Sequence, residues 1–149
     1  MPTRRRPRDG VIVLQESGVT YAFVEETLPV IEREGFNLHV VYVASAELFD
    51  LLPAAERERI FPGALAREAM GITGFTLPTL YRWVTSEEGR AASMHPFARG
   101  HYLGSGQAHA VLREAGLDGT GQFEAIRTYV RARRAGARPT ARPLRSSPA

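Results

Sequence analysis

The first fifty residues alternate between short apolar runs and a segment with helical spacing. Residues 11–14 are four consecutive apolar residues, the pattern of a strand buried on both faces. Between residues 19 and 31 apolar side chains recur every three or four positions, which predicts a helix with Ser17 as its N-cap and Gly35 at its end. Residues 38–43 favour a second buried strand. This order predicts a βαβ unit with a right-handed crossover.

The alternation continues as far as residue 132. Residues 64–72 fit a strand and a helix equally well, whereas residues 91–97 favour a strand. Helices or helical turns are predicted from Ser45 and over residues 54–60, 77–84, 107–115 and 123–132. We therefore predict one α/β domain over residues 10–132, with a mainly parallel sheet in three layers and helices on both faces. The flanking residues 1–9 and 133–149 are basic and poor in apolar side chains, and we expect both tails to be disordered.

The composition excludes several classes of protein. The 149 residues are 44% hydrophobic, enough for one core, and the absence of cysteine excludes disulfides, thiolate metal sites and a cysteine nucleophile. The longest apolar runs are far shorter than the roughly 20 residues of a membrane helix. No signal-peptide pattern follows the basic start. We expect a soluble, cytoplasmic protein that does not associate with membranes.

Charge is distributed unevenly along the chain. All 19 basic residues are arginine, and the formal net charge is +3. Residues 9–130 hold nine arginines against all sixteen acidic residues, a net charge of −7, whereas the ten arginines outside this range contribute +10. The predicted domain is therefore acidic and carries no nucleic-acid-binding motif, so no specific nucleic-acid partner is expected. Solvated tails and loose polyanion binding by the tails both remain open.

One loop has the features of an anion site. Glycine-rich nucleotide-binding motifs are absent, including from the turn over residues 16–18. In the loop over residues 99–106, backbone amides beside glycines precede a predicted helix, an arrangement that can hold an anion. The candidate anion-binding residues are Arg99, His101, Gly104, Ser105 and Gly106. An ordinary turn explains the same glycines, so both interpretations stay open.

Catalytic and metal motifs are not found. The four histidines lack the spacing of a recognised metal-binding pattern, so no metal site is predicted. Ser105 is not in a nucleophile-elbow motif, because Leu103 stands where that motif needs glycine. No catalytic residue is therefore predicted, which disfavours a small hydrolase.

Residues 75–84 contain Phe, Tyr and Trp around an arginine, a composition enriched at protein interfaces. The candidate interface residues are Phe75, Leu80, Tyr81 and Trp83. Completion of the domain core is the alternative role for these side chains.

Taken in order, the segments over residues 10–132 resemble the transketolase C-terminal domain. The resemblance rests on the strand over residues 11–14, the turn Glu16-Ser17-Gly18, the strand over residues 38–43 and the step Ser45-Ala46-Glu47-Leu48-Phe49. Tyr102-Leu103-Gly104-Ser105-Gly106 before a helix is similar to a later segment of that family. Two segments depart from the family pattern: Arg67-Glu68-Ala69-Met70-Gly71-Ile72 is a poor version of a family strand, and Tyr102-Leu103 replaces the usual Phe-Gly.

The resemblance implies a function and also implies that this chain has no catalytic centre of its own. Enzymes of this family hold thiamine diphosphate and Mg²⁺ between two other domains, and their Gly-Asp-Gly magnesium motif does not occur in this chain. It therefore implies an assembly or regulatory domain or subunit of a thiamine-diphosphate-dependent transferase, with no catalytic centre or bound cofactor of its own. Its partner would be a second copy or a chain with the cofactor-binding domains. Two alternatives remain: the C-terminal domain of the β chain of a 2-oxoacid dehydrogenase, and an independent module binding a phosphorylated metabolite or nucleotide.

Overall fold

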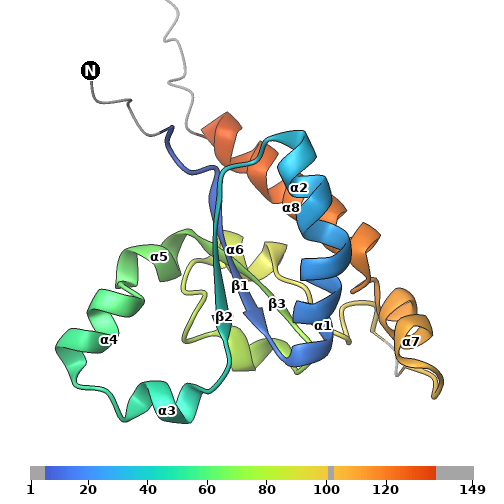
Figure 1. Ribbon diagram of the computed structural model, residues 1–149, viewed down its shortest axis with the longest axis horizontal. Helices are drawn as coiled ribbons and strands as arrows, with labels where there is room; N and C mark the ends of the chain where they lie inside the picture. Colours follow the sequence, from blue (N-terminus) through green and yellow to red (C-terminus); the bar gives the residue numbers. More distant parts are fainter. Residues whose placement is uncertain (1–5, 101–102, 137–149) are drawn as a thin grey trace, which may run out of the picture.

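A parallel three-stranded sheet with the order β2-β1-β3 forms the centre of the structure, a computed structural model that describes residues 6–100 and 103–136 (Figure 1). The strands are β1 (Gly10–Gln15), β2 (Leu38–Val43) and β3 (Ala69–Thr73). In the middle of the sheet, Ile12 of β1 lies opposite Val40 of β2 and Met70 of β3. The predicted βαβ unit is thus present, and β3 extends it on the other side of β1.

The two predicted strands differ in burial. β1 is buried on both faces, as predicted, because it lies between two neighbours and helices cover both sides of the sheet. The strand over residues 38–43 is confirmed, but the expectation that it is buried is wrong. β2 lies at an edge of the sheet, and its Val40 and Tyr42 side chains are 39% and 47% exposed.

Helices follow each strand. The crossover between β1 and β2 is one continuous helical segment in which a π-helical turn joins two α-helices. Its parts are α1 (Ser17–Ala22), η1 (Phe23–Thr27) and α2 (Leu28–Glu34). The other helices are α3 (Ala46–Asp50), α4 (Ala54–Ile60), α5 (Gly63–Glu68), the 3-10 turn η2 (Leu77–Leu80), α6 (Glu87–Ala92), α7 (Ala108–Ala115) and α8 (Gly119–Gly136). Gly35 ends α2 in a left-handed conformation (φ 70°), as predicted.

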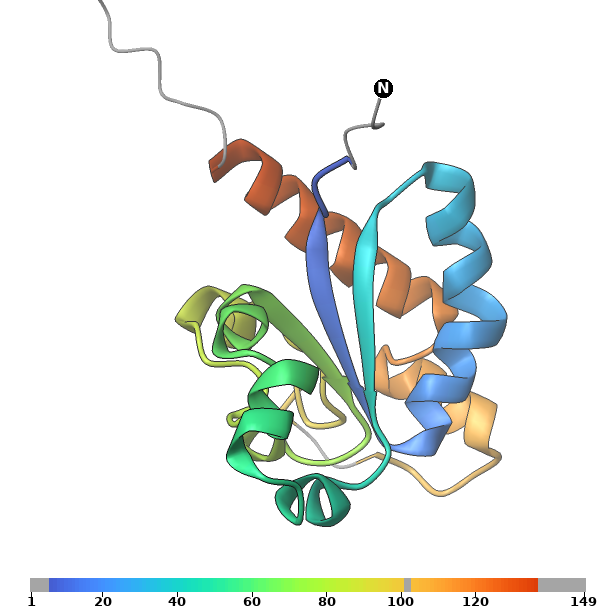
Figure 2. The ribbon, with the colours of Figure 1, turned by 60° about the vertical axis from the view of Figure 1, so that its left-hand side comes forward.

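The helices make two layers around the sheet, which confirms the predicted three-layer α/β architecture (Figure 2). One hydrophobic core packs alternate side chains of β1 and β3, such as Ile12 and Met70, against the crossover helix and α8. The second core packs Val11 and Val13 against α5 and the segment around Trp83. The 2-residue period of the strands thus divides their side chains between two cores.

Two segments differ from the sequence-based expectation. The strand predicted over residues 91–97 is wrong: α6 occupies its start, and only Met94 pairs with β3, at Ile72. The Ser86 side chain caps α6, and Gly89 lets the helix lie against β3, since a Cβ there would be 2.1 Å from the Ala69 carbonyl oxygen. The ambiguous residues 64–72 divide into the end of α5 and most of β3.

The domain extends beyond residues 10–132 at both ends. α8 continues to Gly136, where Arg134 pairs with Asp9 at 2.9 Å. At the other end, Arg8 forms two hydrogen bonds to the Glu68 carboxylate. The remaining tail residues lie outside the described ranges. Within those ranges, no helix has both the length and the apolar character needed to cross a membrane.

Candidate functional site

The carboxyl edge of the sheet is where open α/β folds bind ligands, at the point where strand order reverses. In this sheet, with the order β2-β1-β3, that point lies at the carboxyl ends of β1 and β3. Glu16 follows β1 directly, and its carboxylate accepts hydrogen bonds from the backbone N–H groups of Gly18 (2.6 Å) and Val19 (3.2 Å). The protein's own carboxylate therefore occupies the helix start that would otherwise attract an anion.

The geometry of Glu16 corrects the prediction that Ser17 caps this helix. Glu16 has a φ of 83°, the only positive value among the described residues other than glycine. Such a conformation costs on the order of 1 kcal/mol or more and must be held by its surroundings. The Glu16 carbonyl accepts from the Thr20 hydroxyl at 2.7 Å, and Gly74 makes room for the carboxylate, because a Cβ there would lie 2.4 Å from Oε2.

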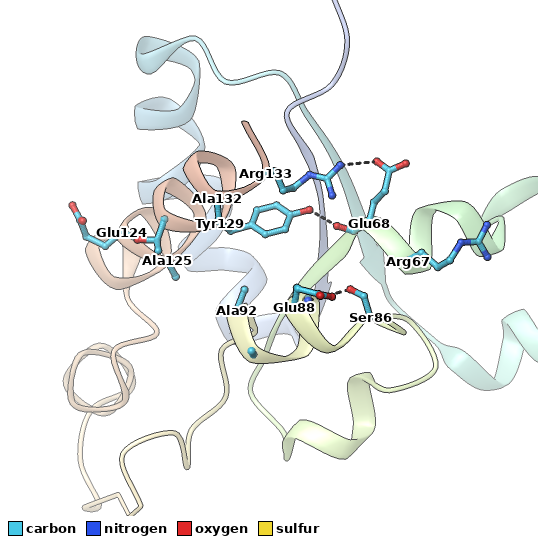
Figure 3. A pocket seen from close by; sticks show the side chains of 13 residues that line it. Arg67, Glu68, Ser86, Glu88, Ala92, Glu124, Ala125, Tyr129, Ala132 and Arg133 are labelled. Carbon is cyan, nitrogen blue, oxygen red and sulfur yellow. Dashed lines mark hydrogen bonds and ion pairs between the residues drawn. The ribbon is translucent and has the colours of Figure 1, made fainter. Parts of the chain in front are cut away.

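A cavity of about 680 Å³, the α6–α8 groove, lies between these two helices and the end of α5 (Figure 3). Its small apolar side chains are four alanines, two from each of α6 and α8: Ala91, Ala92, Ala125 and Ala132. Its charged residues are Arg67, Glu68, Glu88, Glu124 and Arg133. The small alanine side chains leave the groove open to another segment, and the charges of both signs around them can orient it.

Tyr129 attaches α8 to the sheet beside this groove. Its side chain is 6% exposed, and its hydroxyl accepts from the Val11 backbone N–H at 3.1 Å and donates to the Glu68 carbonyl oxygen (Figure 3). Burial raises the pKa of Tyr129, which keeps the phenol neutral. Gly10 makes room for the ring, since a Cβ there would lie 2.4 Å from Cε1. Tyr129 is thus a structural anchor of the groove.

The acidic residue at the end of α5 is fully engaged. The Arg8 guanidinium donates two hydrogen bonds to the Glu68 carboxylate, at 2.8 and 3.0 Å, and Arg133 donates a third at 3.2 Å. These bonds, with Arg8 contributing most, lower the pKa of Glu68. A carboxylate held ionised in this way is a poor proton shuttle, so Glu68 is suited to binding rather than to acid–base chemistry.

Metal ligation has no support in the residues described. No group of three or more His, Asp or Glu side chains within residues 6–100 and 103–136 is arranged to hold an ion.

The predicted anion loop has internal partners. Arg99 donates to the Glu114 carbonyl oxygen at 2.7 Å, and the Gly104 N–H points to the Glu114 carboxylate at 3.4 Å. Ser105 and Gly106 are exposed, and His101 lies outside the described residues. A carboxylate therefore lies beside the amide that was expected to face an anion. Anion binding at residues 99–106 stays a prediction.

The four candidate interface residues separate into two pairs. Leu80 and Trp83 are buried, with 0% and 3% exposure, and Trp83 packs edge-to-face against Phe49 and Phe61. Phe75 and Tyr81 are 49% and 41% exposed. Within this chain, Leu80 and Trp83 are therefore core residues, and an interface role stays a prediction for the exposed pair.

Sequence reasoning did not identify Glu16 or the α6–α8 groove. One feature of the sequence could have identified Glu16: it lies directly after a predicted buried strand and before a predicted helix. The groove residues come from segments more than sixty positions apart, such as Arg67 and Arg133, and no local pattern links them.

Comparisons with known proteins bear on the fold. No family model and no curated protein sequence matches the chain. Among solved structures, the chain is similar to a transketolase from Campylobacter jejuni subsp. jejuni, with a TM-score of 0.57 and 18% sequence identity. The match covers 85% of this chain but only 18% of the transketolase chain. The transketolase-like α/β fold expected from the sequence is therefore confirmed.

Proposed function

We propose that this chain is a non-catalytic assembly or regulatory domain of a transketolase-like enzyme and acts with a partner chain that carries the thiamine-diphosphate-binding domains. The extent of the structural match is the observation that carries this proposal: most of this chain corresponds to less than a fifth of a transketolase. A domain of that share needs other domains to complete an enzyme.

Thiamine diphosphate with Mg²⁺ does not fit the carboxyl edge of the sheet. There a diphosphate would need free N–H donors at the helix start and ligands for the cation. At the carboxyl edge of this sheet the Glu16 carboxylate already accepts the backbone N–H groups of Gly18 and Val19. The sequence contains no Gly-Asp-Gly motif, and the described side chains form no cluster of metal ligands. The proposed role is therefore one of binding and assembly.

The α6–α8 groove is the surface that we assign to the partner chain. Its small alanines leave room for the side chains of a partner, and its three carboxylates and two guanidinium groups can set the register of that partner. Ala91 is exposed and lines the groove, so a long charged side chain at this position would block close approach without disturbing the core.

The test compares Ala91→Arg with Ala55→Arg, a matched substitution at an exposed position of α4 outside the groove. Each tagged variant is expressed in the organism from which the sequence comes, and the co-purifying proteins and their transketolase activity are measured. We expect the unmodified chain and Ala55→Arg to recover a partner with thiamine-diphosphate domains, and Ala91→Arg to recover at least about tenfold less. Equal recovery by both variants would remove the groove from the proposal, and recovery of no such partner by any of them would refute the function.

A further inference from the structure

A second large cavity is lined by residues of α3, α4 and α5 and of the segment that follows η2. Its volume is about 750 Å³, and its charged lining includes Arg57 of α4, Arg67 of α5 and Arg82, which follows η2. We call it the arginine cavity. Three arginines from three segments converge here, although the residues 9–130 that contain them carry a net charge of −7.

The carboxylates around the arginine cavity already have partners. Arg82 donates two hydrogen bonds to Asp50, at 2.9 and 2.5 Å, and Arg57 reaches the same carboxylate at 3.8 Å. The acid that lines the cavity itself, Glu58, accepts from the Gly63 backbone N–H at 3.2 Å. Glu47, which also attracts Arg82, accepts from the Ser45 hydroxyl.

Arg67 is the arginine of the cavity that has no acidic partner among the described residues. Within residues 6–100 and 103–136, no hydrogen bond or ion pair reaches its guanidinium group, and the side chain is exposed. An arginine on the wall of a cavity with no acidic partner presents its paired N–H donors to whatever enters.

Two further donors at the arginine cavity lack acceptors. The Nε atom of Arg57 and the Nε1 atom of Trp83 are buried and have no hydrogen-bond partner, and the Trp83 side chain is 3% exposed. Buried donors are paired in most proteins, so two orphans lining one cavity call for an explanation. The Arg57 side chain is 40% exposed, and rotation about its torsions can turn its donors into the cavity.

Aromatic rings hold the third arginine in place. The Arg82 guanidinium lies over the Trp83 ring, 4.6 Å from its centroid. Its N–H groups donate hydrogen bonds to the Asp50 carboxylate. Phe49 and Phe61 pack edge-to-face on Trp83 and complete this wall. The cavity therefore combines a rigid aromatic wall with arginines of which Arg82 has an acidic partner and Arg67 has none. Its volume is suited to a small molecule.

From these observations we propose that the arginine cavity binds a small molecule through an oxyanion group, a phosphate or a carboxylate. Arg67 supplies a bidentate donor pair to the oxyanion, and the N–H groups of Arg57 add further donors. The aromatic wall takes the apolar part of the ligand. This site is distinct from the loop over residues 99–106, and it shares one lining residue, Arg67, with the α6–α8 groove.

Trp83 provides the readout for the test, because it is the only tryptophan in the sequence and lines the cavity. The full chain is titrated with inorganic phosphate and, separately, with citrate, at ionic strength held constant with sodium chloride. The proposal predicts a saturable change of tryptophan fluorescence with at least one of the two anions. The anion that binds more tightly identifies the oxyanion as phosphate or carboxylate.

Two variants locate the response. Arg67→Gln, at an exposed position with no partner, should raise the Kd by about tenfold or more, because a hydrogen bond to a charged group is lost. Arg113→Gln in α7, where the side chain is 76% exposed, is the matched control and should leave the Kd unchanged. Circular dichroism checks that both variants are folded. An unsaturable response to both anions, or an equal Kd in Arg67→Gln, would overturn the proposal.

Discussion

Replacing Tyr129 with phenylalanine removes one oxygen atom from the junction of α8 with β1 and β3. The ring can stay in place, because phenylalanine fills the same space beside Gly10. The variant loses the acceptor of the Val11 N–H and the donor to the Glu68 carbonyl oxygen. Both backbone groups lie where two strands begin, so the substitution tests whether this polar junction holds the groove together.

The expected loss follows from the burial of these groups. A buried polar group left without a partner costs about 1–3 kcal/mol. The Val11 residue has no exposed surface, whereas Glu68 is only partly buried and its carbonyl can find water more easily. We therefore expect a loss of about 2 kcal/mol in the free energy of unfolding. For a domain of this size that corresponds to a fall in Tm of roughly 5–10 °C.

Urea unfolding followed by circular dichroism gives the free energy, and a thermal melt gives the Tm. The matched control is Tyr81→Phe, since Tyr81 is 41% exposed and no hydrogen bond of its hydroxyl occurs among the described residues. The control should change stability by less than about 0.5 kcal/mol. If Tyr129→Phe were as stable as the control, the hydroxyl would not be anchoring the strands and the reasoning would fail.

Three further predictions follow from the same structure. Gly89→Ala should cost about 3 kcal/mol in a urea titration, since its Cβ would meet the Ala69 carbonyl oxygen, whereas Gly136→Ala, with open space around it, should be neutral. Hydrogen bonding by Arg8 lowers the pKa of Glu68, so its contribution to stability is complete above the unfolded value near 4.5 and is lost as pH falls through the lower folded value. Melts between pH 7 and pH 3 should therefore show a shallower acid dependence in Glu68→Gln than in the unmodified chain. Isothermal titration calorimetry with thiamine diphosphate should detect no Mg²⁺-dependent binding to this chain alone, and a micromolar Kd that requires Mg²⁺ would contradict the assembly role.

The central strand and the crossover helix were predictable because their signals are local. A continuous apolar run identifies β1, and the three-to-four spacing and Gly35 locate the helix that follows. The burial of β2 was not predictable in this way. Its exposure depends on β3 pairing on the far side of β1, which is a property of the whole sheet.

Two errors arose where local preference competed with a close contact. Serine is a common N-cap, yet the helix is capped one residue earlier, by the side chain of Glu16, whose φ is positive. Gly74 leaves the space that the Glu16 carboxylate occupies. The apolar character of residues 91–97 favoured a strand, although Ser86 followed by two glutamates is a helix-start pattern that could have located α6. The groove itself was beyond sequence reasoning, because contacts between distant segments create it.

Native mass spectrometry of the complex purified from the source organism tests the central claim most directly. The chain has a mass of 16.4 kDa, so its copies can be counted in any assembly. The proposal predicts a stable complex of this chain with a larger partner, in which thiamine diphosphate and Mg²⁺ remain on the partner when the two are dissociated in the gas phase. Recovery of this chain only by itself or with copies of itself, or thiamine diphosphate retained on this chain after dissociation, would contradict the proposal.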